Sequence, residues 1–151
     1  VARDLGNLAL IHRAKGEREI AERLLARAAE INTRIGCLEG LANDYANLGQ
    51  VFGERGDAAT ARKYHEASRE LEERLGRGEG LARSHHSLGL ICYSCGDTAG
   101  AERHWESAAE LFDRAGLSND SAQVRAMLAA MGAGLDPVMD APALMRKNRP
   151  R

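Results

Sequence analysis

The sequence has few aromatic residues and almost no proline. Aromatic side chains make up 4% of the 151 residues, and the three prolines, Pro137, Pro142 and Pro150, all lie near the C-terminal end. Because proline breaks the interior of a helix, its absence from the preceding residues leaves long helices free to form there. Alanine, leucine and arginine recur instead. This composition is typical of closely packed helices with small residues at their contacts.

Three further shortages exclude whole classes of protein. The formal net charge is only −1, so bulk electrostatics predict neither a nucleic-acid partner nor a membrane surface. No apolar run approaches the roughly 20 residues that a membrane span requires, and no secretory signal is present. The three cysteines, Cys37, Cys92 and Cys95, lie in helical patterns, which predicts a reducing cytoplasm rather than a disulfide framework.

The sequence repeats itself with a period of 40 residues, most plainly at Leu8, Leu48 and Leu88, and Leu128 marks an incomplete fourth unit. Repetition at this spacing is typical of solenoids, in which each unit buries its apolar face against its neighbours. Turn glycines, small helix residues and closing apolar residues also recur at fixed offsets: Gly16, Gly56 and Gly96; Ala21, Ala61 and Ala101; Ile31, Leu71 and Leu111; Gly36, Gly76 and Gly116.

Each unit is predicted to be a pair of helices joined by a glycine turn. An acidic residue after that glycine can cap the second helix of the pair. The mid-helix glycines Gly49 and Gly89 are expected to face Ala61 and Ala101, so that the two backbones approach closely. First helices are expected over 2–14, 40–54 and 80–94, second helices over 17–34, 57–75 and 97–115, and a capping helix over 120–132.

These positions resemble the tetratricopeptide repeat. The second unit carries Tyr45, Leu48, Gly49, Phe52, Gly56, Ala61, His65 and Ser68. The third carries His85, Leu88, Gly89, Cys92, Gly96, Ala101, Trp105 and Ala108, and the first carries Leu5, Leu8, Ala9, His12, Gly16, Ala21, Leu25 and Ala28. The period exceeds the usual length of about 34. This long form resembles repeats of kinesin light chains, of the Partner-of-Inscuteable group and of bacterial regulator-associated arrays.

The resemblance implies an all-α fold: an α-α superhelix of three helix-turn-helix repeats with a C-terminal capping helix. The repeats are expected at about 1–39, 40–79 and 80–119, within an array that spans 1–134. The chain begins at Val1, inside a helical pattern and without a methionine, and is expected to be a piece of a longer protein. A basic, flexible tail is expected over 135–151.

The resemblance also implies a non-enzymatic scaffold whose first helices line a concave groove for an extended segment of another protein. Asparagine amides offer a donor and an acceptor to such a segment. The arginines suggest an acidic or C-terminal carboxylate element in the partner. The alternative is a solvated polar face without a ligand. The predicted groove residues are Arg3, Asn7, Arg13, Asn43, Asn47, Gln50, Arg83, His86, Ser87 and Tyr93, with Leu10 and Leu90 beside them.

No catalytic group, cofactor or metal ligand is predicted. Cys92 and Cys95, with His85 and His86 nearby, could chelate zinc or form a redox pair. However, Cys92 takes the place of Phe52 in the preceding unit, which favours core packing. No histidine stands in a recognisable catalytic triad. A metal- or redox-linked module is therefore kept only as a minor alternative.

A second alternative is self-assembly into a homo-oligomer through the repeat ends or the tail. An exposed apolar repeat end promotes end-to-end contact. The tail could also fold back, or dock into a neighbouring copy's groove. Its apolar residues are Leu135, Val138, Met139, Leu144 and Met145, and its basic residues are Arg146, Lys147, Arg149 and Arg151.

Overall fold

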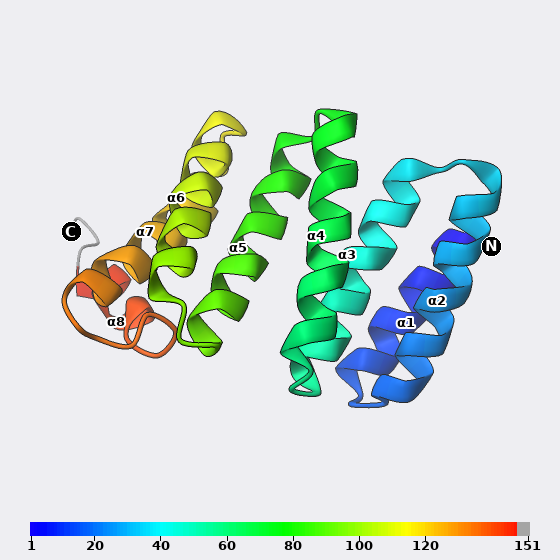
Figure 1. Ribbon diagram of the computed structural model, residues 1–151, viewed down its shortest axis with the longest axis horizontal. Coiled ribbons are helices and arrows are strands. Elements are labelled where there is room, and N and C mark those ends of the chain that lie inside the picture. Colours follow the sequence, from blue (N-terminus) through cyan, green and yellow to red (C-terminus); the bar gives the residue numbers. More distant parts are fainter. Residues whose placement is uncertain (148–151) are drawn as a thin grey trace. The chain divides into compact units, whose positions relative to one another are not determined.

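The computed structural model describes residues 1–147, and over this range every regular element is a helix (Figure 1). The predicted all-α fold of repeated helix pairs is confirmed. Arg149 and Arg151 of the predicted basic tail lie outside the described residues. In chain order the helices are α1 (Ala2–Ala14), α2 (Arg18–Ile35), α3 (Leu38–Glu54), α4 (Ala58–Leu75), α5 (Gly78–Ser94), α6 (Thr98–Arg114), α7 (Ser118–Gly132) and α8 (Ala141–Lys147).

The helix ends follow the predicted turn chemistry in most places. Gly36 and Gly76 end α2 and α4 with φ angles of 70° and 66°, a left-handed conformation that costs other residues strain. Asp57 accepts a 3.0 Å hydrogen bond from the backbone N of Thr60, and thereby caps α4. Asp97 caps α6 through a 2.8 Å bond from Gly100 N. Glu17, which precedes α2, makes no such bond.

Unit 1 covers Val1–Arg77 and contains α1 to α4. Consecutive helices pack against each other, and Figure 1 shows α1 beside α2 and α3 beside α4. Its core has two parts. One joins α1, α2 and α3, and the other joins α2, α3 and α4. Their buried residues are Ala9, Ala21, Leu25, Leu48 and Val51 in the first, and Ala29, Leu41, Ala42 and Leu71 in the second.

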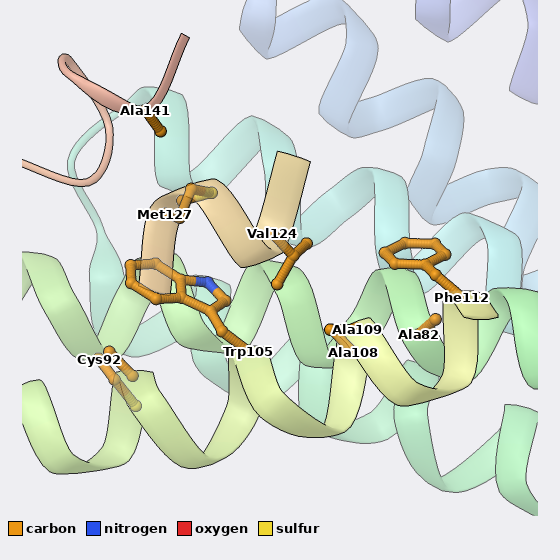
Figure 2. Close-up of a cluster of buried hydrophobic side chains, with 10 residues drawn as sticks. Ala82, Cys92, Trp105, Ala108, Ala109, Phe112, Val124, Met127 and Ala141 are labelled. Atoms are coloured by element: carbon orange, nitrogen blue, oxygen red, sulfur yellow. The ribbon is translucent and has the colours of Figure 1, made fainter. Parts of the chain in front are cut away.

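Unit 2 covers Gly78–Arg151, of which the structure describes the residues up to Lys147. Its core surrounds Trp105 of α6, which is 0% exposed. Figure 2 groups this ring with Cys92 of α5, Val124 and Met127 of α7, and Ala141 of α8. The expected capping helix therefore exists as α7, and it covers α6 with an apolar face.

Large rings, rather than alanines, lie against the mid-helix glycines. A Cβ on Gly49 would stand 2.6 Å from Nε2 of His65, and one on Gly89 would stand 2.3 Å from Nε1 of Trp105. The expectation that Ala61 and Ala101 face these glycines was wrong about the partner. Glycine is needed at both positions because an imidazole or an indole occupies the space that a methyl group would fill.

The segment after Gly134 was expected to lack regular structure, but it forms a turn followed by α8. The carboxylate of Asp136 accepts hydrogen bonds from the backbone N of Val138 at 2.8 Å and of Met139 at 3.1 Å. Ala141 is 2% exposed and belongs to the core of unit 2. A helix of seven residues is too short to be stable by propensity, so burial against α7 holds it in place.

Candidate functional site

In unit 1, six of the predicted groove residues lie on α1 and α3. We call them the unit-1 face: Arg3, Asn7, Arg13, Asn43, Asn47 and Gln50. Arg13 joins the two helices, because its guanidinium donates to the side-chain oxygen of Gln50. Its Nε also lies 3.6 Å from Oε1 of Glu54. The structure therefore brings Arg13 of α1 and Gln50 of α3 together.

The three asparagines of the unit-1 face have unused hydrogen-bonding capacity. Asn7 and Asn43 are exposed, and Asn47 is half-buried. Within residues 1–147 none of the three side-chain amides has a hydrogen-bond partner in the protein. Each amide keeps a carbonyl acceptor and two N–H donors for a ligand. Two of these three amides lie on α3, at positions 43 and 47, one helical turn apart.

A buried polar pair in unit 1 was not predicted from the sequence. Asn32 of α2 donates a 2.7 Å hydrogen bond from Nδ2 to Oδ2 of Asp44 on α3. Burial raises the pKa of Asp44 to about 6, although the bond from Asn32 acts in the opposite direction. A Cβ on Gly40 would stand 2.6 Å from Asn32 Nδ2, so this glycine makes room for the pair. Polar residues at core positions were the signal available in the sequence.

His65 is a second buried titratable group in unit 1. It is 4% exposed, and burial lowers the pKa of its imidazole to about 4. Its Nδ1 has no hydrogen-bond partner among the described residues. The equivalent residues of the other repeats are Leu25 and Trp105, which are both buried apolar side chains. This histidine is therefore a neutral residue of the core, and we assign it no role in ligand binding.

In unit 2, the predicted residues Arg83, His86, Ser87 and Tyr93 all lie on α5. Arg83 is exposed and forms a 2.7 Å ion pair with Glu79, one turn earlier. The other three are half-buried, and the Tyr93 ring lies 6.0 Å from the Trp105 ring. Arg83 is therefore already paired with a carboxylate of its own helix.

His86 lines a hollow in unit 2. Its Nε2 is buried without a hydrogen-bond partner in the described part of the chain. Burial lowers the pKa of this imidazole, while the charge of Asp120 acts to raise it. The hollow has a volume of about 310 Å³. We call it the unit-2 hollow, and its lining residues are His86, Leu90, Gln123, Met127, Pro137, Val138, Ala141, Pro142 and Met145.

His86 and Leu90 were predicted from the sequence to lie on a binding face, but the hollow itself was not predicted. The opposite wall comes from α7, and the remaining wall comes from the turn before α8 and from α8 itself. The apolar residues after Gly134 were the available signal. Which residues they would contact could not be inferred from them, because these contacts join segments about 50 residues apart.

The cysteine pair is divided between the core and the surface. Cys92 is buried beside Trp105, whereas Cys95 is exposed and free. Within residues 1–147 no group of three or more histidine, cysteine or acidic side chains is placed to hold a metal ion. His85 and His104 lie with their Nδ1 atoms 3.0 Å apart, so one ring donates to the other. They replace the Tyr45–Tyr64 ring pair of the preceding repeat.

Comparison with known proteins identifies the helix pairs. A sequence model of the tetratricopeptide repeat matches residues 2–74 and 42–114. The chain belongs to the tetratricopeptide repeat family. Repeats of this family generally mediate protein–protein interaction or scaffolding, and the family is generally non-catalytic. No curated protein matches the sequence.

The fold of this tetratricopeptide repeat protein is also similar to a solved structure, the crystal structure of BtubC (BKLC) from P. vanneervenii. The TM-score is 0.67 at 18% sequence identity. The match covers 99% of this chain and 66% of that one, so the chain spans less than two thirds of its length. None of the helices in the described residues is long and apolar enough to cross a membrane.

Proposed function

We propose that this protein is an interaction scaffold whose unit-1 face binds an extended segment of another protein. The observation that carries the proposal is the set of unpaired amides of Asn7, Asn43 and Asn47 on α1 and α3. An extended main chain presents N–H and C=O groups alternately, and an asparagine side chain can pair with both. An extended residue advances about 3.3 Å along the chain. Amides one turn apart on α3 therefore match groups two residues apart in such a segment.

We also propose an acidic or C-terminal carboxylate element in the partner, bound by Arg3 and Arg13. Arg3 is exposed and forms no ion pair within residues 1–147. Arg13 is half-buried, and its Nε lies 3.6 Å from Oε1 of Glu54, so a ligand carboxylate would compete with Glu54 for this guanidinium. A carboxylate bound by both arginines would gain charge-assisted hydrogen bonds.

The test compares capture of proteins from source-cell lysate by three forms of the full chain. The native chain is compared with the double variant Asn43→Ala/Asn47→Ala. The matched control is Glu66→Ala/Glu70→Ala, which removes two exposed side chains from α4 instead. Helicity and melting temperature are measured first, and must agree among the three forms.

We expect one set of proteins to be captured by the native chain and by the α4 control, and to be lost with the asparagine variant. A synthetic segment of a captured protein must then bind with the same ranking. Equal capture by all three forms would rule out the unit-1 face. If binding falls with rising salt, and Arg3→Glu weakens it further, the acidic element is supported.

A second candidate function is self-association through the outer face of α1. Leu8 and Ile11 are 43% and 52% exposed, whereas the equivalent residues Leu48 and Val51 are 2% and 0% exposed. Leu48 and Val51 are covered by α1 and α2, so a comparable helix would bury Leu8 and Ile11. Sedimentation velocity tests this over a hundredfold range of concentration. A size that grows for the native chain but not for Leu8→Lys/Ile11→Lys supports association, and a constant monomer excludes it.

A further inference from the structure

The chain's own C-terminal segment lies against the first helices of unit 2. α5 is the first helix of the third repeat, and α7 begins the incomplete fourth unit. We call the hollow-lining residues of these two helices the unit-2 face, and residues 136–147 the strap. The strap packs against α7, and Val138 and Met145 of the strap line the same hollow as His86 and Leu90. The other residues of the unit-2 face are Gln123 and Met127.

The strap forms its hydrogen bonds within itself. The carboxylate of Asp136 accepts the bonds from Val138 N and Met139 N described above. Asp136 N donates to Oδ2 of Asp140 at 2.9 Å, and Asp140 N donates to the carbonyl of Asp136 at 2.8 Å. Over the described residues 1–147, no hydrogen bond or ion pair joins the strap to α5, α6 or α7. The strap can therefore leave these helices without breaking a polar contact, and its turn stays formed.

Only a small apolar contact holds the strap in place. Among residues 136–146 the two buried ones are Pro137 and Ala141, and Figure 2 shows Ala141 near Met127 in the core of unit 2. Val138 and Met139 remain 49% and 75% exposed. The strap also leaves the hollow of about 310 Å³ unfilled, although protein interiors are normally close-packed. A segment with so few buried apolar contacts opens at a low free energy.

A glycine-rich connection joins the strap to α7. Gly132 ends α7, and Gly134 follows with a φ angle of 71°. A Cβ on either glycine would meet nothing within 4 Å, so neither is held by its surroundings. Glycine adopts backbone angles that strain other residues, and a few such positions can absorb the rotation of a whole segment. The connection is therefore suited to act as a hinge.

We propose that residues 136–147 are a displaceable, autoinhibitory strap, which closes the unit-2 face as an intramolecular ligand and swings away about Gly132 and Gly134. A protein segment that binds this face must first displace the strap. Its apparent affinity is then lowered by the fraction of molecules in which the strap is open. This inference goes beyond the proposed function and does not depend on it, because the unit-1 face lies on α1 and α3.

The probe that tests the strap is a synthetic peptide with the sequence of residues 135–147. It is titrated, unlabelled, into full chains that carry ¹³C at the methionine methyl groups, where Met127 reports on the unit-2 face. Ala141→Glu should release the strap, because it places a charge at a position that is 2% exposed. Ala143→Glu is the matched control, since the same change falls on an exposed position of α8.

We expect the Met127 signal of Ala141→Glu to differ from that of the native chain, and to return toward it as the peptide saturates the face. A segment on a short linker has an effective concentration in the mM range. A strap that is mostly closed therefore requires a Kd of about 1 mM or lower for the free peptide. In the native chain and in Ala143→Glu, the apparent Kd should be at least about tenfold higher, because the strap competes.

A second variant guards against a misfolded Ala141→Glu. Asp136→Ala removes the acceptor of two backbone N–H groups in the turn and leaves the core unchanged. It should also bind the peptide more tightly than the native chain does. Thermal unfolding followed by the fluorescence of Trp105, the single tryptophan, shows whether unit 2 is folded in each variant.

Three results would overturn the inference. The first is a folded Ala141→Glu chain that does not bind the peptide. The second is an equal Kd for this variant and the native chain, which would mean that the strap does not close the face. The third is loss of the cooperative Trp105 transition in both Ala141→Glu and Asp136→Ala, which would make the strap an integral part of the core. None of these results affects the capture experiment, which depends on Asn43 and Asn47 of unit 1.

Discussion

Asn32 and Asp44 form a hydrogen bond of 2.7 Å in the interior of unit 1, between α2 and α3. The two residues are only 6% and 5% exposed. Burial of the carboxyl group raises the pKa of Asp44 to about 6, so folding shifts this residue toward its protonated form. At neutral pH the folded protein therefore carries a buried carboxylate whose charge is only partly compensated.

Replacing Asp44 with asparagine should stabilise the protein at neutral pH. In the unfolded chain this carboxyl group titrates near 3.8, and in the folded chain near 6. The wild-type protein consequently loses stability as the pH rises from about 4 to 6, and the loss is complete above 6. We expect Asp44→Asn to raise the free energy of unfolding by about 2 kcal/mol at pH 7, with almost no gain at pH 3.5.

Urea unfolding at several pH values measures this difference. Glu66→Gln, an exposed carboxylate on α4, is the control and should show no pH-dependent gain. If Asp44→Asn were less stable than the wild type at pH 7, the prediction would be wrong. The carboxylate of Asp44 would then be a net stabilising partner of Asn32.

Replacing His65 with leucine should protect the protein against acid. The imidazole has a pKa of about 4 in the folded chain and 6.5 in the unfolded chain. Protonation therefore favours unfolding, and wild-type stability falls as the pH drops from 6.5 to 4. We expect His65→Leu to remove up to about 3 kcal/mol of this loss. Leucine fits a position of this kind, since Leu25 occupies the equivalent site in the first repeat.

Thermal unfolding followed by circular dichroism between pH 4 and 7 tests the His65 prediction. Over nearly the same pH range, rising pH lowers the stability through Asp44 and raises it through His65. The two effects therefore partly cancel in the wild-type protein. The stability curves of the two single variants should diverge as the pH changes, and the double variant should still lose stability in acid, because burial also lowers the pKa of His86. Parallel curves for His65→Leu and the wild type would contradict the burial argument.

Gly89→Ala should destabilise unit 2, whereas Gly53→Ala should stabilise unit 1. A Cβ on Gly89 would stand 2.3 Å from Nε1 of the buried Trp105, which forces the ring to move. One on Gly53 would meet only Ala61 Cβ, at 3.9 Å. Overpacking costs about 1–3 kcal/mol, and alanine at an open helical site gains about 1 kcal/mol over glycine. Melting temperatures that shift in the same direction for both variants would refute this assignment.

The contribution of the N-caps of α4 and α6 to the stability of the protein should be measurable, whereas α2 has no equivalent cap. We expect Asp57→Ala and Asp97→Ala each to cost about 1 kcal/mol, because each removes the acceptor of a backbone N–H. Asp57→Asn should keep most of the stability, since its side-chain oxygen can still accept the bond from Thr60. Glu17→Ala should cost less than either, and chemical denaturation can rank all four variants. A Glu17 effect as large as that of Asp97 would contradict the observed difference.

The helices and their ends could be predicted from the sequence, because they depend on local patterns that recur at Leu8, Leu48 and Leu88. The glycine turns were predicted for the same reason: a left-handed residue is needed wherever a helix ends within the unit. Each of these patterns occurs three times in the sequence, which strengthens the prediction of the helices and turns. The family followed from residues such as Tyr45 and Gly49 taken together, since no single position is specific.

What the tertiary structure decided is which side chains meet. His65 rather than Ala61 lies against Gly49, and Asn32 pairs with Asp44, because only the packing of neighbouring helices sets these distances. The pKa values of Asp44 and His65 depend on burial, which no local pattern specifies. The sequence by itself determined the repeating helix pairs of this protein. The unit-2 hollow depends on α8, whose short length makes it a product of contacts with α7, and those contacts exist only in the folded chain.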